Sequence, residues 1–180
     1  MPSTTLYLVR HGEQSPEGAG LSAAGRAQAT SLGRRLTGTR FDAVHHSCLP
    51  RAVQTTQIVT PFLPGVPVHE CDLVKDRTPV PDSYPARYRD FFAAVPEDER
   101  DPGPAVLREA VEHLGAVGER DRTDLVVTHN FVIGWFVRHV LDAPDWRWLG
   151  LNQANCGVTI VRWETSRPAA LICFNDVGHL

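Results

Sequence analysis

The feature that most constrains the fold of this chain is a pair of short apolar runs, each of which leads to a histidine. The run 6–9 leads into Arg10–Glu13, and the run 125–127 leads through Thr128 to His129. Apolar, β-prone runs of this length are typical of strands that are buried on both faces of a parallel sheet. In open α/β sheets, ligands bind beyond the ends of such strands. Both histidines are therefore expected at a binding edge of one sheet.

Strand-like and helix-like segments alternate along the rest of the chain. Strands are expected at 5–9, 41–47, 124–128, 156–163 and 169–174, and helices at 22–36, 50–62, 84–95, 104–118 and 131–141. The proline-rich segment 61–85 has no periodic pattern, which predicts a long loop of the kind that is often functional. The alternation predicts one α/β domain, 1–180: a three-layer α/β/α sandwich around a mostly parallel central sheet. The last two strands lack an intervening helix and are expected to be antiparallel.

Composition and charge narrow the classes of partner. The 180 residues carry a formal net charge of −3, which argues against nucleic acid as a partner. No apolar run approaches the ~18 residues of a membrane span, and no signal-type stretch opens the chain, so no membrane partner is expected. Cys48, Cys71, Cys156 and Cys173 form no C-x-x-C pair, which favours a reducing, cytoplasmic location. These features leave the oligomeric state unknown.

Several phosphate-compatible side chains are expected at the same edge of the sheet. Arg10, His11 and His129 follow buried strands, while Ser47 and Arg51 stand where the second strand turns into its helix. The fork of an arginine matches phosphate oxygens. A neutral imidazole beside such a cation is a plausible nucleophile for phosphorus. The sequence therefore predicts a phosphate site built from arginine and histidine.

Four motifs in this order resemble the histidine phosphatase superfamily, which is also called phosphoglycerate mutase-like. They are Arg10–Glu13, Leu21–Ala29, Ser47–Thr55 and Val126–His129. Within the superfamily, three further segments are most similar to the PGAM5-like serine/threonine phosphatases: Asp72–Asp76, His129–Ile133 and Leu151–Thr159. The match covers nearly the whole chain and implies the phosphoglycerate mutase-like fold.

The resemblance implies a histidine acid phosphatase-type phosphomonoesterase. Such an enzyme hydrolyses a phosphoprotein or a small phosphate ester through a phosphohistidine, here on His11. Arg10, Arg51 and His129 would surround the phosphoryl oxygens, where negative charge must be held during transfer. No metal or other cofactor is implied, because these side chains provide the electrostatic clamp.

The proton donor and one phosphate contact are less closely defined by the resemblance. A carboxyl group must protonate the leaving oxygen and then take a proton from water. Comparison with the PGAM5-like pattern favours Asp76, where relatives usually carry glutamate, and Glu70 is the alternative. Asn130 stands where relatives commonly have a small residue, so it is expected to bind phosphate or to narrow the site.

Two other functions remain open at this stage. A phosphoglycerate mutase-type phosphotransferase would have to shield its phosphohistidine from water, and the segment between the second and third strand regions is small for the usual mutase lid. A non-catalytic phosphate-binding module on the same fold is the other alternative, because the usual glutamate is missing. The presence of both arginines and both histidines favours the phosphatase.

Overall fold

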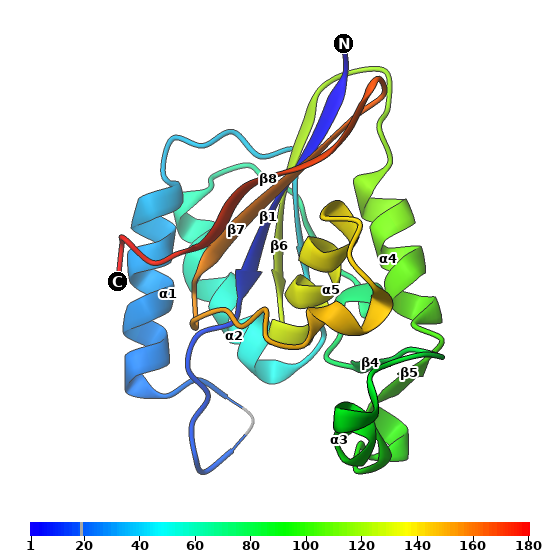
Figure 1. Ribbon diagram of the computed structural model, residues 1–180. Coiled ribbons are helices and arrows are strands. Elements are labelled where there is room, and N and C mark those ends of the chain that lie inside the picture. The colour runs from blue at the N-terminus through cyan, green and yellow to red at the C-terminus, as the bar shows by residue number, and fades with distance from the viewer. Residues whose placement is uncertain (19) are drawn as a thin grey trace.

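A computed structural model describes residues 1–18 and 20–180 and is built around a six-stranded sheet with the order β3-β2-β6-β1-β7-β8 (Figure 1). Its strands are β1 (Ser3–Arg10), β2 (Ala43–His46), β3 (Val68–Glu70), β6 (Arg122–Thr128), β7 (Val158–Glu164) and β8 (Arg167–Asp176). The first four of these run parallel, whereas β7 pairs antiparallel with β1, and β8 pairs antiparallel with β7. The mostly parallel sheet and its antiparallel end are thus confirmed.

Helices cover both faces of this sheet, which confirms the expected three layers (Figure 1). The helices are α1 (Ala23–Leu36), α2 (Pro50–Val59), α3 (Arg89–Ala93), α4 (Ala105–Gly115) and α5 (Asn130–Val140), with short 3-10 turns at 60–62, 72–74, 86–88, 97–99 and 145–148. Ser22 caps α1 by accepting a hydrogen bond from the amide of Gly25. Helices α1 and α2 pack on one face, and α4 and α5 pack on the other (Figure 1).

Strand β1 reads as a continuous apolar run because it contributes to both cores. Leu6 and Leu8 join the core that lies under α4 and α5. Val9 joins the core under α1 and α2. All three side chains are fully buried. Burial on both faces of a central parallel strand removes the polar alternation of a half-exposed strand, which explains the sequence pattern.

The expected loop at 61–85 is wrong in part. It contains the edge strand β3 and the short strand β4 (Thr78–Val80), which pairs in parallel with β5 (Arg100–Pro102) in a second, two-stranded sheet. All three residues of β3 are exposed, so this strand leaves no apolar pattern in the sequence. The helix found in the region expected at 84–95 is also shorter. Pro85 has an extended backbone, and a proline disfavours helical geometry in the residue before it, here Tyr84.

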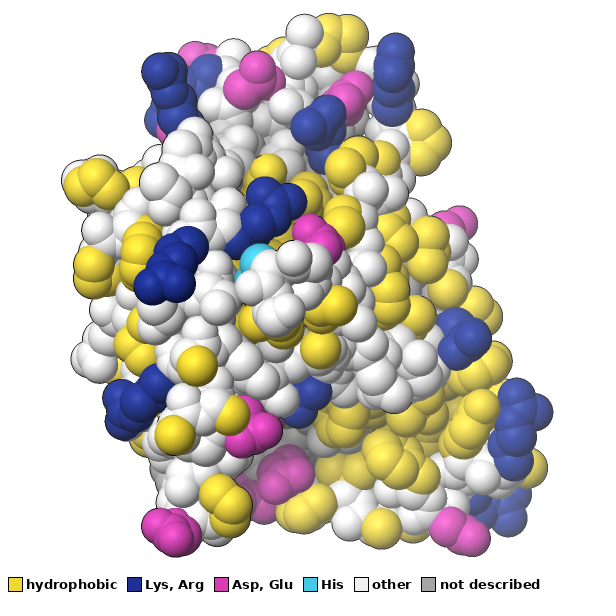
Figure 2. Space-filling view, turned by 90° about the vertical axis from the view of Figure 1, so that its left-hand side faces the viewer, with side chains coloured by type: hydrophobic (Ala, Val, Ile, Leu, Met, Phe, Trp, Pro, Cys, Tyr) yellow, Lys and Arg dark blue, Asp and Glu magenta, His cyan; other side chains and the backbone are white. Residues whose placement is uncertain are grey.

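The surface on the side of α1 carries a mixture of charges. Figure 2 shows basic and acidic side chains dispersed over this face, with hydrophobic side chains between them. Within residues 1–18 and 20–180, no helix combines the length and the apolar character that a bilayer crossing requires.

Candidate active site

His11 and His129 lie side by side at the carboxyl ends of β1 and β6. The parallel register pairs Arg10 with Thr128, and the amide of His11 donates a hydrogen bond of 2.9 Å to the carbonyl of Thr128. The centroids of the two imidazole rings are 5.1 Å apart, and both residues are buried. Two histidines that are 118 residues apart in the sequence thus share one site.

The hydrogen bonds of His11 define its tautomer. Nδ1 lies 2.7 Å from the carbonyl oxygen of Gly12, which can only accept, so Nδ1 carries the proton. Nε2 accepts a hydrogen bond of 3.0 Å from Nε of Arg51. The lone pair of Nε2 therefore faces the guanidinium side of the site. Only glycine fits at position 12, because a Cβ there would lie 2.5 Å from the carbonyl oxygen of Gly25.

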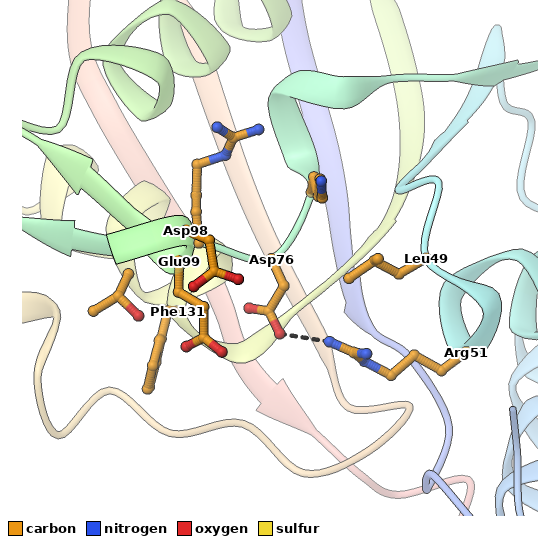
Figure 3. A pocket seen from close by; sticks show the side chains of 9 residues that line it. Leu49, Arg51, Asp76, Asp98, Glu99 and Phe131 are labelled. Atoms are coloured by element: carbon orange, nitrogen blue, oxygen red, sulfur yellow. Dashed lines mark hydrogen bonds and ion pairs between the residues drawn. The ribbon is translucent and has the colours of Figure 1, made fainter. Parts of the chain in front are cut away.

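Arg51 reaches the site from the first turn of α2, where Pro50 begins the helix. Its Nη2 donates a hydrogen bond of 2.6 Å to Oδ2 of Asp76 (Figure 3). Thr55, one turn later, donates to the carbonyl of Arg51 and accepts from the amide of Gly12, at 2.7 and 3.0 Å. The start of α2 and the turn at Gly12 are therefore joined through one hydroxyl group, a contact that the sequence did not predict.

Asp76 belongs to the site although it lies in the segment expected to be a loop. The hydroxyl of Thr128 donates to the carbonyl of Val74 at 2.6 Å, which ties the 72–74 turn to the end of β6. Oδ2 of Asp76 then lies 3.5 Å from Nδ1 of His129. Burial raises the pKa of the Asp76 carboxyl, while the neighbouring Arg51 and Arg10 act in the opposite direction. A raised pKa favours the protonated form that a general acid needs.

The other candidate acid lies elsewhere. Glu70 is exposed at the end of edge strand β3 and does not line the cavity that contains Asp76 and Arg51. Of the two carboxyl groups left open by the sequence, the structure brings Asp76 next to the histidines. Its role as proton donor stays a prediction.

His129 and Arg10 carry buried nitrogen atoms that have no hydrogen-bond partner in the described residues: Nδ1 of His129 and Nε of Arg10. Nε2 of His129 lies 2.8 Å from the hydroxyl of Ser47, which also accepts from the amide of Leu49. With the Ser47 hydroxyl donating to Nε2, Nδ1–H of neutral His129 points toward Asp76. Buried donors normally have partners, so Nε of Arg10 is available to an anionic ligand, while Nδ1 of His129 faces the carboxyl group of Asp76 at 3.5 Å.

Asn130 begins α5, and both ends of its amide group contact the loop before β7. Its Oδ1 accepts from the amide of Gln153 at 2.8 Å, and its Nδ2 donates to Oδ1 of Asn152 at 3.0 Å. Arg10 donates to the carbonyl of Gln153 at 2.7 Å, and Asn155 donates to the carbonyl of His11 at 2.8 Å. Asn130 thus holds the loop that contacts Arg10 and His11, and phosphate binding by Asn130 stays a prediction.

A cavity of about 300 Å³ opens beside Arg51 and Asp76. Figure 3 shows Phe131 and the carboxylates of Asp98 and Glu99 around the same space. The sequence analysis did not single out these two acidic residues, because they lie between the helices expected at 84–95 and 104–118 and belong to no motif. The one available signal was the dense charge of that stretch.

Burial gives both histidines low pKa values. Desolvation, with a smaller effect of the nearby arginines, lowers the pKa of His11 to about 4, against the hydrogen bond to Gly12, which raises it. Desolvation also lowers the pKa of His129 to about 2, and the charges of His11 and the arginines act in the same direction. Both pKa values favour neutral rings near pH 7.

These shifts predict a loss of stability in acid. Unfolded histidine binds a proton near pH 6.5, whereas folded His11 does so only near pH 4. The unfolded state thus binds more protons, and the free energy of unfolding falls as the pH is lowered from 6.5 toward 4, by up to about 1.4 kcal/mol per pH unit for each such histidine. Urea unfolding at several pH values measures this slope. His129→Gln should lower this slope by up to about 1.4 kcal/mol per pH unit, because one buried neutral histidine is removed. A slope equal to that of the wild type would contradict the buried-neutral state.

In the described part of the chain, no three histidine, cysteine, aspartate or glutamate side chains gather as a metal site would require. The donors around His11 instead match an anion with several oxygen atoms, since they combine guanidinium groups with imidazole N–H. A phosphoryl group is an anion of this kind.

Comparison with protein families places this arrangement. The sequence profile described as the histidine phosphatase superfamily (branch 1) matches residues 6–176. The mitochondrial serine/threonine-protein phosphatase Pgam5 of Caenorhabditis briggsae is 29% identical to this chain over an alignment of 191 residues. The alignment covers 99% of this chain and 65% of that protein. Human PGAM5 is 28% identical to this chain over an alignment of 182 residues. This alignment covers 97% of this chain and 63% of that protein. The chain thus spans just under two thirds of these relatives.

Solved structures give the same fold. YhfR of Bacillus stearothermophilus superposes with a TM-score of 0.76 and 26% identity over 98% of both chains. A phosphoserine phosphatase of Entamoeba histolytica, solved with 3-phosphoglyceric acid, superposes with a TM-score of 0.68 and 20% identity, again over 98% of both chains. The second similarity concerns the fold alone.

Proposed function

The chain belongs to the histidine phosphatase superfamily (branch 1), and we propose that it hydrolyses phosphomonoesters through a phosphohistidine on His11. One observation carries this proposal. Nε2 of His11 accepts a hydrogen bond from Nε of Arg51, and the ring of His129 lies beside it. Nε of neighbouring Arg10 is buried without a hydrogen-bond partner in the described residues. This arrangement combines a nucleophile with an oxyanion clamp. The substrate is a phosphoprotein or a small phosphate ester.

The first step transfers the phosphoryl group to the enzyme. Nε2 of His11 attacks phosphorus, the ester P–O bond breaks, and its electron pair goes to the leaving oxygen. Asp76 donates a proton to that oxygen. Arg10 and Arg51 hold the charge on the phosphoryl oxygens. The bound phosphate therefore replaces Asp76 as the partner of the Arg51 guanidinium.

The second step returns the enzyme to its starting state. Water attacks the phosphorus of the phosphohistidine, and the carboxylate of Asp76 accepts a proton from that water. The P–N bond breaks and its electron pair returns to Nε2. The hydrogen bond from Nδ1 to Gly12 holds the ring in the same tautomer throughout.

The proposal includes a cytoplasmic location. All four cysteines are free thiols, as expected in a reducing compartment. No nucleic acid or membrane partner forms part of the proposal.

Hydrolysis of p-nitrophenyl phosphate in the presence and absence of EDTA tests the function. We expect equal rates in both, because the charge clamp consists of protein side chains. Quenching with alkali and detergent during turnover should trap protein-bound phosphate that is stable to base and is released by acid, as phosphohistidine is. Loss of activity in EDTA would contradict the metal-independent mechanism. Stable phosphohistidine without turnover would instead indicate a phosphate-binding module.

A further inference from the structure

Two carboxylates face the active-site cavity without taking part in the phosphate site. Asp98 and Glu99 lie on the 97–99 turn that leads into β5. Their side chains point into the space beside Asp76 (Figure 3). The phosphoryl group belongs on the His11 side of this space, so the two carboxylates lie where the leaving group of a substrate would pass.

The charges of these two side chains are not neutralised by the fold. Within the described residues, neither Asp98 nor Glu99 forms an ion pair or a side-chain hydrogen bond, whereas neighbouring Glu97 pairs with Arg100 at 3.7 Å. The cavity also contains two further cations. Arg77 is held by Asp72, at 3.3 Å between side chains. Arg51 is paired with Asp76, so Lys75 is the cation of the lining that stands opposite the two unpaired carboxylates. The unpaired groups of the lining thus carry more negative than positive charge.

An apolar cavity continues from this acidic wall. It has a volume of about 230 Å³ and shares Thr78, Glu99 and Phe131 with the first cavity. The rest of its lining is hydrophobic: Phe91, Ala94, Val95 and Pro96. Phe91 is 40% exposed, so its ring is accessible from solvent.

An aliphatic stem that ends in a cation fits both parts of this surface. The stems of lysine and arginine pack on apolar surface while their charged heads stay with polar partners. An arginine head would also lie near the rings of Phe91 and Phe131, which attract cations. Two neighbouring subsites of different character match successive side chains of an extended peptide better than they match one compact metabolite.

We propose that Asp98 and Glu99, together with the apolar cavity beside them, bind an arginine or lysine side chain of a phosphopeptide substrate close to its phosphorylated residue. This inference rests on the proposed phosphatase function and adds a substrate class to it. The same carboxylates disfavour substrates that carry an acidic group at this place, since like charges repel across the cavity.

The test compares phosphoserine peptides that differ only by arginine or glutamate, one or two residues from the phosphoserine on either side. Release of inorganic phosphate gives kcat/KM for each peptide. In the wild-type protein, we expect the arginine peptide to exceed the glutamate peptide by roughly tenfold at one position at least, and the ratio to fall with added salt. In Asp98→Asn/Glu99→Gln, the ratio should fall toward one. The matched double variant Glu109→Gln/Glu112→Gln, on the exposed side of α4, should keep the wild-type ratio.

The outcomes separate this inference from the function on which it rests. If the wild-type protein hydrolyses p-nitrophenyl phosphate but treats the peptide pairs equally, or hydrolyses no peptide, the basic-peptide subsite is wrong and the phosphatase function stands. A wild-type ratio that persists in Asp98→Asn/Glu99→Gln would also overturn it. If the wild-type protein hydrolyses no ester, the proposed function itself fails.

Discussion

His11→Ala is expected to lower kcat/KM for p-nitrophenyl phosphate by about 10⁴-fold or more, because the nucleophile of a covalent mechanism has no substitute. Water would have to attack the ester directly in a site whose donors are arranged around Nε2 of His11. Steady-state rates at neutral pH measure the effect. Quenched reactions of the variant should contain no protein-bound phosphate.

His113→Ala is the matched control for this loss. His113 is exposed on α4, outside the site, so its replacement should leave kcat/KM within about twofold of the wild type. Equal urea unfolding midpoints for wild type and His11→Ala would separate a chemical effect from a folding defect. Substantial activity in a folded His11→Ala protein would overturn the phosphohistidine mechanism.

Asp76→Asn is expected to have the second largest effect, and one that depends on the leaving group. For an alkyl ester such as phosphoserine, kcat should fall by about 10²- to 10³-fold, since the leaving alkoxide then lacks its proton donor. For p-nitrophenyl phosphate the fall should be less than about tenfold, because the nitrophenolate leaves without protonation. The ratio of the two losses is the measurement, since removing the contact with Arg51 affects both substrates alike.

Glu70→Gln distinguishes the two candidate acids. Glu70 is exposed on β3, so the Glu70→Gln variant should hydrolyse both esters at wild-type rates. A large loss with phosphoserine in Glu70→Gln, together with wild-type behaviour of Asp76→Asn, would transfer the acid role to Glu70. Rates of Asp76→Asn and Glu70→Gln with the two esters thus decide which carboxyl group is the proton donor.

The sheet and its binding edge were predictable because their signals are local. Apolar runs before His11 and His129 reflect strands buried on both faces, and parallel pairing then brings their ends together. Arg51 was predictable for the same reason, since Pro50 marks the start of its helix at the end of β2. Patterns of this kind depend on the strand or helix itself and on few partners.

The segment between α2 and α4 was not predictable in this way. Strands β3, β4 and β5 are three residues long, and β3 has no buried side chain, so hydrophobic periodicity is absent. Pro85 separates Tyr84 from the short helix that follows. Phe92 is buried and Phe91 is exposed, although both lie in one aromatic stretch. The burial of each ring depends on how it packs against other parts of the chain.

The sequence by itself determined the fold class, the sheet edge at which the candidate site lies, and the histidines and arginines that stand there. Only the tertiary structure decided which carboxyl group joins them, through the contact of Thr128 with Val74 that draws Asp76 to the end of β6. It also decided that Asp98 and Glu99 face the same cavity. The physical reason is that strand ends are positioned by regular hydrogen-bond ladders, whereas the course of a loop depends on contacts between residues far apart in the sequence.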